Sequence, residues 1–242
     1  MIVAQISDIH ADGSERALER LDKVIDWLRP MRPDALIVSG DLAEGSFDRS
    51  YGDVKGRLES VGCPYFVVPG NVDDHHDLRQ AFGERFGWTG ERPLNVVGEV
   101  DGLRLIGLDV TVEGGHHGDA APVLDWLAAE LGSATTPTLI FQHQHPFPTG
   151  IDGKDRNICL GGEALAAVIE AAGETVLALT CGHVHRALFT RFAGRQATMA
   201  PSVTRANRLR LDGREGEIRD PPGLLLHHIK HGRLVSHAVL VD

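Results

Sequence analysis

Apolar and polar positions along the chain follow two periods, one typical of buried strands and one typical of amphipathic helices. The clearest helical stretch follows Ser14, a candidate N-cap, where apolar side chains recur at positions 18, 21, 24, 25 and 28. Strands that alternate with helices predict right-handed crossovers and a largely parallel sheet, and therefore an α/β fold. The expected strands cover residues 2–7, 34–40, 64–70, 94–100, 103–110, 136–143 and 175–182, and further helices are expected at 48–61, 121–131 and 162–172.

Turn dipeptides mark three places where neighbouring strands should pair in antiparallel fashion. Asp101-Gly102 is a strong hairpin signal, and two more hairpins are expected to turn at Ala193-Gly194 and His231-Gly232. The polar stretch 208–222 is expected to be either a flap or an ordinary surface loop. No repeat, low-complexity tract or long linker interrupts the pattern, so we expect residues 1–242 to form a single domain.

Composition narrows the class of protein. The chain has 242 residues, 42% of them hydrophobic and 24% charged, which is typical of a globular protein with one large core. No apolar run is long enough for a spanning helix, so we expect no membrane association and a cytoplasmic location. Cys63, Cys159 and Cys181 are scattered, which suits buried thiols in a reducing compartment. The net charge of −10 disfavours a nucleic-acid polymer as partner, whereas a small anionic substrate and a homo-oligomer remain open.

Polar side chains follow nearly every predicted strand, at the point where the chain leaves it. The carboxyl ends of strands in an open α/β sheet converge on one edge, so these side chains should face a common crevice. Each alone is commonly a turn or cap residue. Five strand ends that all carry Asp, Asn or His, however, favour a metal site, and these donors suit Mn, Fe or Zn. The residues are Asp8, His10, Asp41, Asn71, His143, His183 and His185.

The order Asp-x-His, Gly-Asp, Gly-Asn-x-Asp, His and Gly-His-x-His resembles the calcineurin-like metallophosphoesterase superfamily. Within it, the chain looks most like bacterial class III cyclic-nucleotide and glycerophosphodiester phosphodiesterases, through segments 107–110, 141–151, 181–189, 200–203 and 220–227. The resemblance implies a four-layer α/β/β/α sandwich that holds two divalent metal ions. It also implies the ligand sets, which are Asp8, His10 and His185 for one metal, Asn71, His143 and His183 for the other, and Asp41 as the bridge between them.

The same resemblance implies hydrolysis of a small phosphodiester by a hydroxide that bridges the two metals. Two divalent ions outweigh the two carboxylates of Asp8 and Asp41, and the surplus positive charge would attract a phosphate into an otherwise acidic protein. Catalytic roles are expected for Asp41, Asn71, Asp73 and His143. The alternatives are a phosphomonoesterase on the same site and a catalytically silent metal- or nucleotide-binding protein.

The first departure from the family pattern lies at Val72. The family motif reads Gly-Asn-His-Asp, with the His as proton donor or charge stabiliser near the leaving group, whereas this chain reads GNVDDHH. Valine donates no proton, so another group must serve or the substrate needs none. His75 and His76 follow closely and either contact substrate or start a solvated helix. By the resemblance, Asp73 orients a ligand.

The second departure is the segment HQHP, where relatives commonly show His-His-Pro-Pro. We favour His143 over His145 as the ligand, because His143 directly follows the strand TLIF, where the backbone is best fixed. Arg156, Asn157 and Arg205 lie in stretches that border the site in similar proteins. Each of them either contacts substrate or is an ordinary surface residue.

Overall fold

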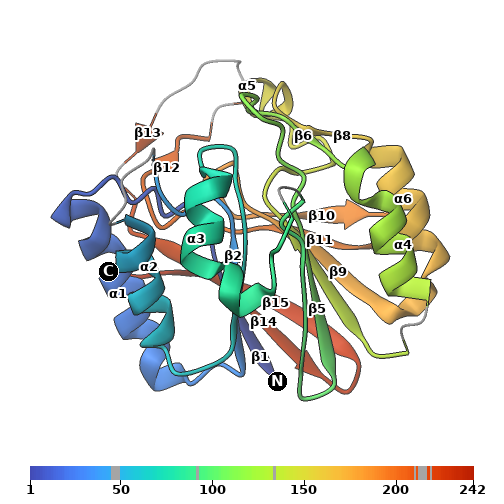
Figure 1. Cartoon of the computed structure of the whole chain (residues 1–242), viewed down its shortest axis with the longest axis horizontal. Coiled ribbons are helices and arrows are strands. Elements are labelled where there is room, and N and C mark those ends of the chain that lie inside the picture. The colour runs from blue at the N-terminus through green and yellow to red at the C-terminus, as the bar shows by residue number, and fades with distance from the viewer. Residues whose placement is uncertain (45–49, 91–92, 133–134, 210, 212–216, 219) are drawn as a thin grey trace.

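The computed structural model describes residues 1–44, 50–90, 93–132, 135–209, 211, 217–218 and 220–242. Two β-sheets face each other, and helices cover the outer face of each sheet, which gives the four layers expected from the sequence (Figure 1). One sheet has the strand order β15-β14-β1-β2-β3, and the other has the order β10-β11-β9-β7-β5-β4. Among the described residues, no helix combines the length and the apolar character needed to cross a membrane.

The first sheet is built from the amino-terminal β–α repeats. Its parallel strands are β1 (Ile2–Ile6), β2 (Ala35–Ser39) and β3 (Tyr65–Val68). The intervening helices are α1 (Glu15–Met31) and α2 (Ser50–Glu59), and they pack against this sheet together with α3 (His75–Phe86). The predicted N-cap is confirmed, because Ser14 Oγ accepts a hydrogen bond from the Ala17 N–H at 3.4 Å. Residues 48 and 49 of the expected second helix lie outside the described part of the chain.

The second sheet repeats this plan in the other half of the chain. Its strands are β4 (Val96–Val100), β5 (Leu103–Leu108), β7 (Thr138–Gln142), β9 (Val176–Cys181), β10 (Leu188–Phe192) and β11 (Arg195–Met199). The strands β5, β7, β9 and β11 are parallel. The outer face is covered by α4 (Leu124–Gly132) and α6 (Gly162–Ala171), which the apolar pattern predicted at nearly these bounds.

All three predicted hairpins are present. The dipeptides Asp101-Gly102, Ala193-Gly194 and His231-Gly232 each have two consecutive positive φ angles, the conformation that matches the twist of paired strands. The third turn joins β14 (Gly223–Lys230) to β15 (Arg233–Leu240), and this hairpin returns to the first sheet, where β14 pairs antiparallel with β1. The chain therefore ends beside the sheet in which it began.

Several short elements were not predicted by periodicity. They are too short for a periodic signal, and tertiary contacts fix them. Residues 210, 212–216 and 219 of the polar stretch 208–222 lie outside the described residues, so that expectation stays open. The additional elements are β6 (Gly118–Asp119), β8 (Cys159–Leu160), β12 (Ala206–Asn207), β13 (Glu217–Ile218), the helix α5 (Asp152–Asp155) and two 3₁₀ turns at Ala121–Val123 and Gly173–Thr175.

Buried polar side chains connect the two facing sheets. Gln5 of β1 donates to Ser39 Oγ at 2.8 Å within its own sheet, and its Oε1 accepts a hydrogen bond from Thr180 of β9 in the other sheet at 2.5 Å. The same Oε1 lies 3.0 Å from Nε2 of His227 on β14. All four residues are fully buried. Hydrogen bonds in an apolar interior fix the position of one sheet relative to the other, and this position determines where the strand ends of the two sheets meet.

Candidate metal centre

The predicted ligands follow the carboxyl ends of strands in both sheets, and five of them have an unusual backbone conformation. Asp8, His10, Asp41, His183 and His185 all have φ between +51° and +72°, the left-handed region that non-glycine residues seldom adopt. Such strain is concentrated at functional sites, where the surrounding structure holds it in place. Each of these turns directs a side chain back toward the gap between the two sheets.

Three glycines next to these residues leave room for them. A Cβ atom at Gly40 would lie 2.5 Å from the His143 ring, and one at Gly70 would lie 2.2 Å from Oδ1 of Asp41. A Cβ at Gly182 would lie 1.9 Å from Ser7 Oγ. Contacts this short exclude any side chain. The glycines seen beside the polar residues in the sequence therefore allow close packing of strand ends as well as tight turns.

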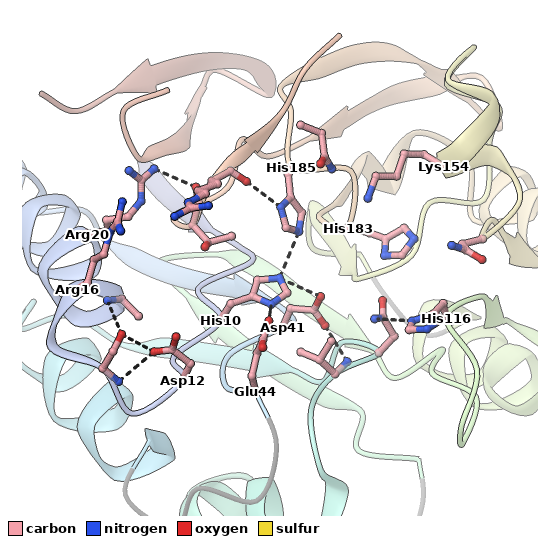
Figure 2. A pocket seen from close by; sticks show the side chains of 18 residues that line it. His10, Asp12, Arg16, Arg20, Asp41, Glu44, His116, Lys154, His183 and His185 are labelled. Atoms are coloured by element: carbon pink, nitrogen blue, oxygen red, sulfur yellow. Dashed lines mark hydrogen bonds and ion pairs between the residues drawn. The ribbon is translucent and has the colours of Figure 1, made fainter. Parts of the chain in front are cut away.

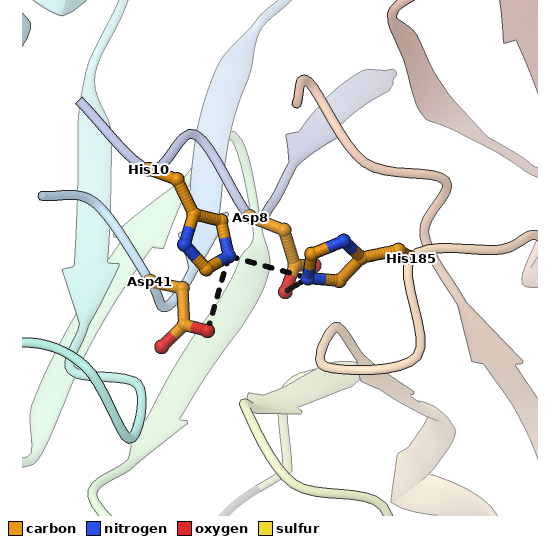
Figure 3. Close-up of side chains that lie close together, drawn as sticks. All are labelled: Asp8, His10, Asp41 and His185. Atoms are coloured by element: carbon orange, nitrogen blue, oxygen red, sulfur yellow. Dashed lines mark hydrogen bonds and ion pairs between the residues drawn. The ribbon is translucent and has the colours of Figure 1, made fainter. Parts of the chain in front are cut away.

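Four of the predicted ligands form one compact cluster (Figure 3). Asp8, His10, Asp41 and His185 each offer a donor atom within 4.8 Å of the others. Nε2 of His185 lies 3.2 Å from Asp8 Oδ1, and Nε2 of His10 lies 3.4 Å from Asp41 Oδ2. The expected bridging carboxylate is thus next to the donors of the first expected metal.

Hydrogen bonds determine which ring nitrogen of His10 and of His185 is available to a metal. Nδ1 of His10 lies 2.8 Å from Glu44 Oε1, and Nδ1 of His185 lies 3.0 Å from the Arg205 carbonyl. With Nδ1 as the donor in both rings, the two Nε2 atoms carry lone pairs, and they face each other at 3.2 Å. Two lone pairs at this distance repel unless a cation lies near them, so this arrangement fits a metal ion.

The second expected ligand set supplies three orphaned polar atoms. Oδ1 of Asn71, Nε2 of His143 and Nε2 of His183 are buried, and none has a hydrogen-bond partner among the described residues. The His143 ring is oriented by its Nδ1, which donates to the Ser39 carbonyl at 2.7 Å, and its Nε2 lies 3.2 Å from Asp41 Oδ2. Buried polar atoms without hydrogen-bond partners are destabilising. A cation bound by all three would remove that penalty, so the residues present fit a second metal.

The electrostatics of the site suit metal binding. Burial alone would raise the pKa values of Asp8 and Asp41, but the adjacent histidines outweigh burial and lower both, that of Asp41 to about 2. Burial lowers the pKa of His183 well below its ordinary value. Burial would also lower that of His143, but the Asp41 carboxylate raises the pKa of this ring to about 9. Ionised carboxylates and neutral imidazoles bind metals, so binding at His143 must displace a proton.

Asp73 lies beneath the cluster and holds the backbone. Its Oδ2 accepts from the Gly70 N–H at 2.8 Å, and its Oδ1 accepts from the N–H groups of Leu42 and Ala43 at 3.0 and 3.1 Å. Tyr51 donates a further hydrogen bond to Oδ1 at 3.1 Å. Burial and the nearby Asp41 raise the pKa of Asp73 to about 6. The carboxylate thereby ties the turn after β2 to the turn after β3, which agrees with an orienting role better than with contact to substrate.

The structure distinguishes the two histidines of the segment HQHP. His143 faces Asp41, whereas Nε2 of His145 lies 3.4 Å from Asp155 Oδ1. Burial lowers the pKa of His145 to about 4. The His145 ring also packs on that of His183, with centroids 5.8 Å apart. His145 is thus placed behind the ligand candidates, between them and the α5 segment.

The cluster opens into a cleft of about 590 Å³ (Figure 2). Of the residues expected to contact substrate, Asn157 and Arg205 line this cleft. His75 instead points toward Asp109, with its Nε2 3.0 Å from both Asp109 Oδ2 and Thr111 Oγ1, and it lines a neighbouring hollow. Of the described residues, those that line the cleft beside the metal cluster include neither Arg156 nor His75.

Several cleft residues were missed by the sequence reasoning. Glu44 orients His10, and His116 Nδ1 lies 3.4 Å from Asn71 Nδ2. Lys154 projects toward His183 and His185 (Figure 2); its charge adds to burial in lowering the pKa of His183, whereas the Asp8 carboxylate raises the pKa of His185. These residues lie in loops or far apart along the chain, so no local spacing identifies them. The remaining missed residues with charged side chains are Asp12, Arg16 and Arg20.

The family model for calcineurin-like phosphoesterases matches residues 1–187, and the chain belongs to this family. The family and the sandwich fold expected from the sequence are therefore confirmed.

Two curated relatives are similar over most of the chain. A probable glycerophosphodiester phosphodiesterase, GpdQ, of Arcobacter nitrofigilis is 32% identical, and the match covers 94% of this chain and 88% of the relative. A cAMP/cGMP dual specificity phosphodiesterase of Mycobacterium tuberculosis is also 32% identical, over 84% of this chain and 67% of the relative. Among solved structures, a dimetal phosphatase from Danio rerio shares the fold, with a TM-score of 0.71, 14% identity, and coverage of 100% of this chain and 99% of the other.

Proposed function

We propose that this protein is a dinuclear-metal-dependent phosphodiesterase that hydrolyses small phosphodiesters of the cyclic-nucleotide or glycerophosphodiester type. The observation that carries the proposal is the set of orphaned buried atoms on Asn71, His143 and His183 next to the carboxylate of Asp41. A binding site for the second metal accounts for all three, and the clustered donors around Asp8 account for the first. The substrate class is supported by the two relatives, one a probable glycerophosphodiester phosphodiesterase and the other a cAMP/cGMP dual specificity phosphodiesterase.

In this proposal each metal has its own ligands and shares one carboxylate. Asp8, His10 and His185 would hold the first ion, and Asn71, His143 and His183 the second. Asp41 would bridge them, because its Oδ2 lies within 3.4 Å of donors from both sets. The donors are oxygen and imidazole nitrogen without thiolate, so Mn, Fe or Zn are the proposed metals. When bound, the pair would supply Lewis acidity and lower the pKa of water toward neutrality.

The chain's own groups complete the site in specific ways. The Val72 N–H donates to Asp41 Oδ1 at 3.0 Å and so fixes the bridging carboxylate, while Glu44 and the Ser39 carbonyl orient two of the imidazoles. Lys154 and Asn157 line the cleft beside the histidines and would contact the phosphate or the leaving group. Asp73 keeps the turns that carry these residues in register.

We also propose that residues 1–242 act as one metallophosphoesterase domain in the cytoplasm, alone or as a homo-oligomer. All three cysteines are free, and burial raises the pKa of Cys63 to about 11 and of Cys159 to about 12. Unreactive thiols of this kind suit a reducing compartment and have no part in the proposed chemistry.

The test of the proposed function combines metal content with substrate class. Protein reconstituted separately with Mn, Fe or Zn should bind about two equivalents and hydrolyse 3′,5′-cyclic nucleotides or glycerophosphodiesters faster than the matching monoesters. Asp41→Ala should lose most bound metal and all measurable activity, whereas His75→Ala should retain the metal content of the wild type. Two full equivalents in Asp41→Ala would overturn the bridging assignment, and faster turnover of monoesters would identify the protein as a phosphomonoesterase.

A further inference from the structure

The cleft has a basic end that the metal ligands do not use. Arg16 and Arg20 lie one turn apart near the start of α1, and both line the cleft, as does Arg205 (Figure 2). Burial, followed by the charges of Arg16 and Arg205, lowers the pKa of Arg20, while the charge of Asp220 acts in the opposite direction. In a chain with a net charge of −10, such a grouping opposes the charge of the whole molecule. Like charges placed together are unfavourable unless an anion accompanies them.

Arg20 is held in a fixed position at this end of the cleft. Its Nε donates to the Val203 carbonyl at 2.7 Å, and its Nη2 donates to the carbonyls of Thr204 and Asp220 at 2.9 and 3.0 Å. These bonds occupy one edge of the planar guanidinium group and leave Nη1 without a hydrogen bond to these carbonyls. A guanidinium oriented in advance loses little entropy when it binds a carboxylate or phosphate.

The same backbone segment that holds Arg20 also contacts the metal site. The N–H groups of Val203 and Thr204 donate to the carbonyls of Ser7 and Asp8 at 3.0 and 2.9 Å. One residue later, the Arg205 carbonyl accepts the hydrogen bond from His185 Nδ1. The basic end of the cleft therefore has a defined position relative to the first ligand set, as a site for a second group of the same substrate requires.

The acidic residues that line the same cleft already have partners. Asp12 Oδ1 accepts hydrogen bonds from the Ser14 N–H and hydroxyl at 2.9 and 2.5 Å, and Glu44 is bound to His10. Asp41 belongs to the metal cluster. Among the described residues, no carboxylate forms an ion pair with Arg16, whose side chain is exposed.

We propose that Arg16 and Arg20 form an anion subsite, and that the natural substrate is a phosphodiester with a second anionic group on one of its alcohol arms. The proposal rests on the proposed phosphodiesterase function and deepens it by naming the substrate class. The scissile phosphate lies at the metal ligands, and the second anion, a carboxylate or a phosphate, lies against the guanidinium groups of α1.

The test uses metal-loaded protein and three p-nitrophenyl phosphodiesters whose other alcohol ends in a carboxylate, a phosphonate or the carboxamide that is isosteric with the carboxylate. At low salt, kcat/KM for at least one anionic arm should exceed that for the carboxamide by about tenfold, the size of one charge-assisted hydrogen bond. The preferred arm identifies the anion, and the preference should shrink as salt rises. In Arg16→Gln the ratio of anionic to carboxamide kcat/KM should fall toward one.

Lys23→Gln is the matched control, because Lys23 is an exposed cation of α1 outside the cleft, and the ratio should survive this change. Calorimetry should measure the affinities of the three non-hydrolysable methylene analogues of these diesters. In wild type the affinities should rank as the kcat/KM values do, and in Arg16→Gln the preference for the anionic arm should be lost. Equal kcat/KM for all three arms, or an unchanged ratio in Arg16→Gln, would overturn the subsite while leaving the phosphodiesterase intact. If none of the diesters is hydrolysed, the proposed function fails, and the binding series still decides the subsite.

Discussion

At the scale of single residues, the site depends on which group each ring nitrogen faces. His143 and His145 are two residues apart and equally buried, yet only Nε2 of His143 faces Asp41, while His145 lies against Asp155. The difference follows from the Ser39 carbonyl, which fixes Nδ1 of His143 and turns its other nitrogen toward the cluster. One backbone acceptor thus selects the ligand candidate from two histidines.

This selection predicts the outcome of two alanine variants. His143→Ala should weaken metal affinity by about 10- to 100-fold or more, since it removes a direct ligand, whereas His145→Ala should change affinity much less. Metal titration with a competing chelator measures both. Greater metal loss in His145→Ala would place the ligand two residues further along the chain.

Val72 predicts a dependence on the leaving group. Its side chain lines the cleft where the family pattern has a histidine, so departure of a basic alkoxide lacks that proton donor. Val72→His should raise kcat/KM by about tenfold or more for alkyl esters and least for aryl esters, and Val72→Leu, which adds bulk without a proton, should not. The measurement is the slope of log kcat/KM against leaving-group pKa at fixed metal content. Parallel slopes in wild type and Val72→His would mean that another cleft residue, such as Lys154, already does this work.

At the scale of elements, the site depends on how closely the ends of neighbouring strands approach. The turn after β9 passes the turn after β1 so tightly that the His183 N–H donates to both Asp8 oxygens at 3.1 Å. The Gly182 N–H meanwhile donates to the His143 carbonyl at 3.1 Å. Three strand ends are therefore joined by hydrogen bonds from the backbone N–H groups of Gly182 and His183, and these bonds place the ligands that the strand ends carry.

Gly182→Ala should disrupt this junction. The new methyl would lie 1.9 Å from Ser7 Oγ and 2.9 Å from the Ser39 carbonyl, and overpacking of this kind destabilises by about 1–3 kcal/mol. Urea unfolding and metal titration should both show a loss. Gly56→Ala is the control, because a Cβ there meets no heavy atom of the described residues within 4 Å and the helix α2 should gain up to about 1 kcal/mol. Unchanged metal affinity in Gly182→Ala would contradict the proposed junction.

At the scale of the whole molecule, the candidate metal centre exists only because the two sheets pack against each other in one fixed register. The apolar residues between them supply the contact, and the buried polar network around Gln5 supplies the direction. His227 belongs to this network, with Nδ1 2.9 Å from Ser236 Oγ and Nε2 3.0 Å from Gln5 Oε1. Its burial lowers the pKa of the ring from 6.5 to about 4.

This pKa predicts how stability depends on pH. Between about pH 6.5 and pH 4 the unfolded chain protonates His227 and the folded protein does not, so the contribution is fully present above pH 6.5 and is lost as pH falls. The resulting change in the free energy of unfolding is at most about 3 kcal/mol, since one unit of pKa corresponds to about 1.36 kcal/mol. Urea unfolding of chelator-treated protein across this range should give a shallower pH dependence for His227→Gln than for wild type. The exposed His228→Gln should behave as wild type does, and an equal slope in all three would refute the assignment.

The sequence by itself determined the α/β class, four of the described helices (α1, α2, α4 and α6), the three hairpins and the order of polar strand ends. These features are local, since periodicity, caps and turn dipeptides act over a few neighbouring residues. It also placed Asp8, Asp41 and His185 at strand ends, where parallel topology makes the residues converge. Only the resemblance to a family, and no spacing, suggested how the seven residues divide between two metals.

Tertiary structure alone decided which atoms face one another. Contacts such as Glu44 with His10, Arg205 with His185 and Arg20 with Asp220 join residues up to 200 positions apart along the chain, the largest separation being that of the bond from Arg20 to Asp220. It also placed His75 against Asp109 rather than in the cleft, although His75 is close in sequence to Asn71. Helix and strand periodicities specify which face of an element is buried, whereas the side chain that meets a given atom is set by the packing of whole sheets against each other.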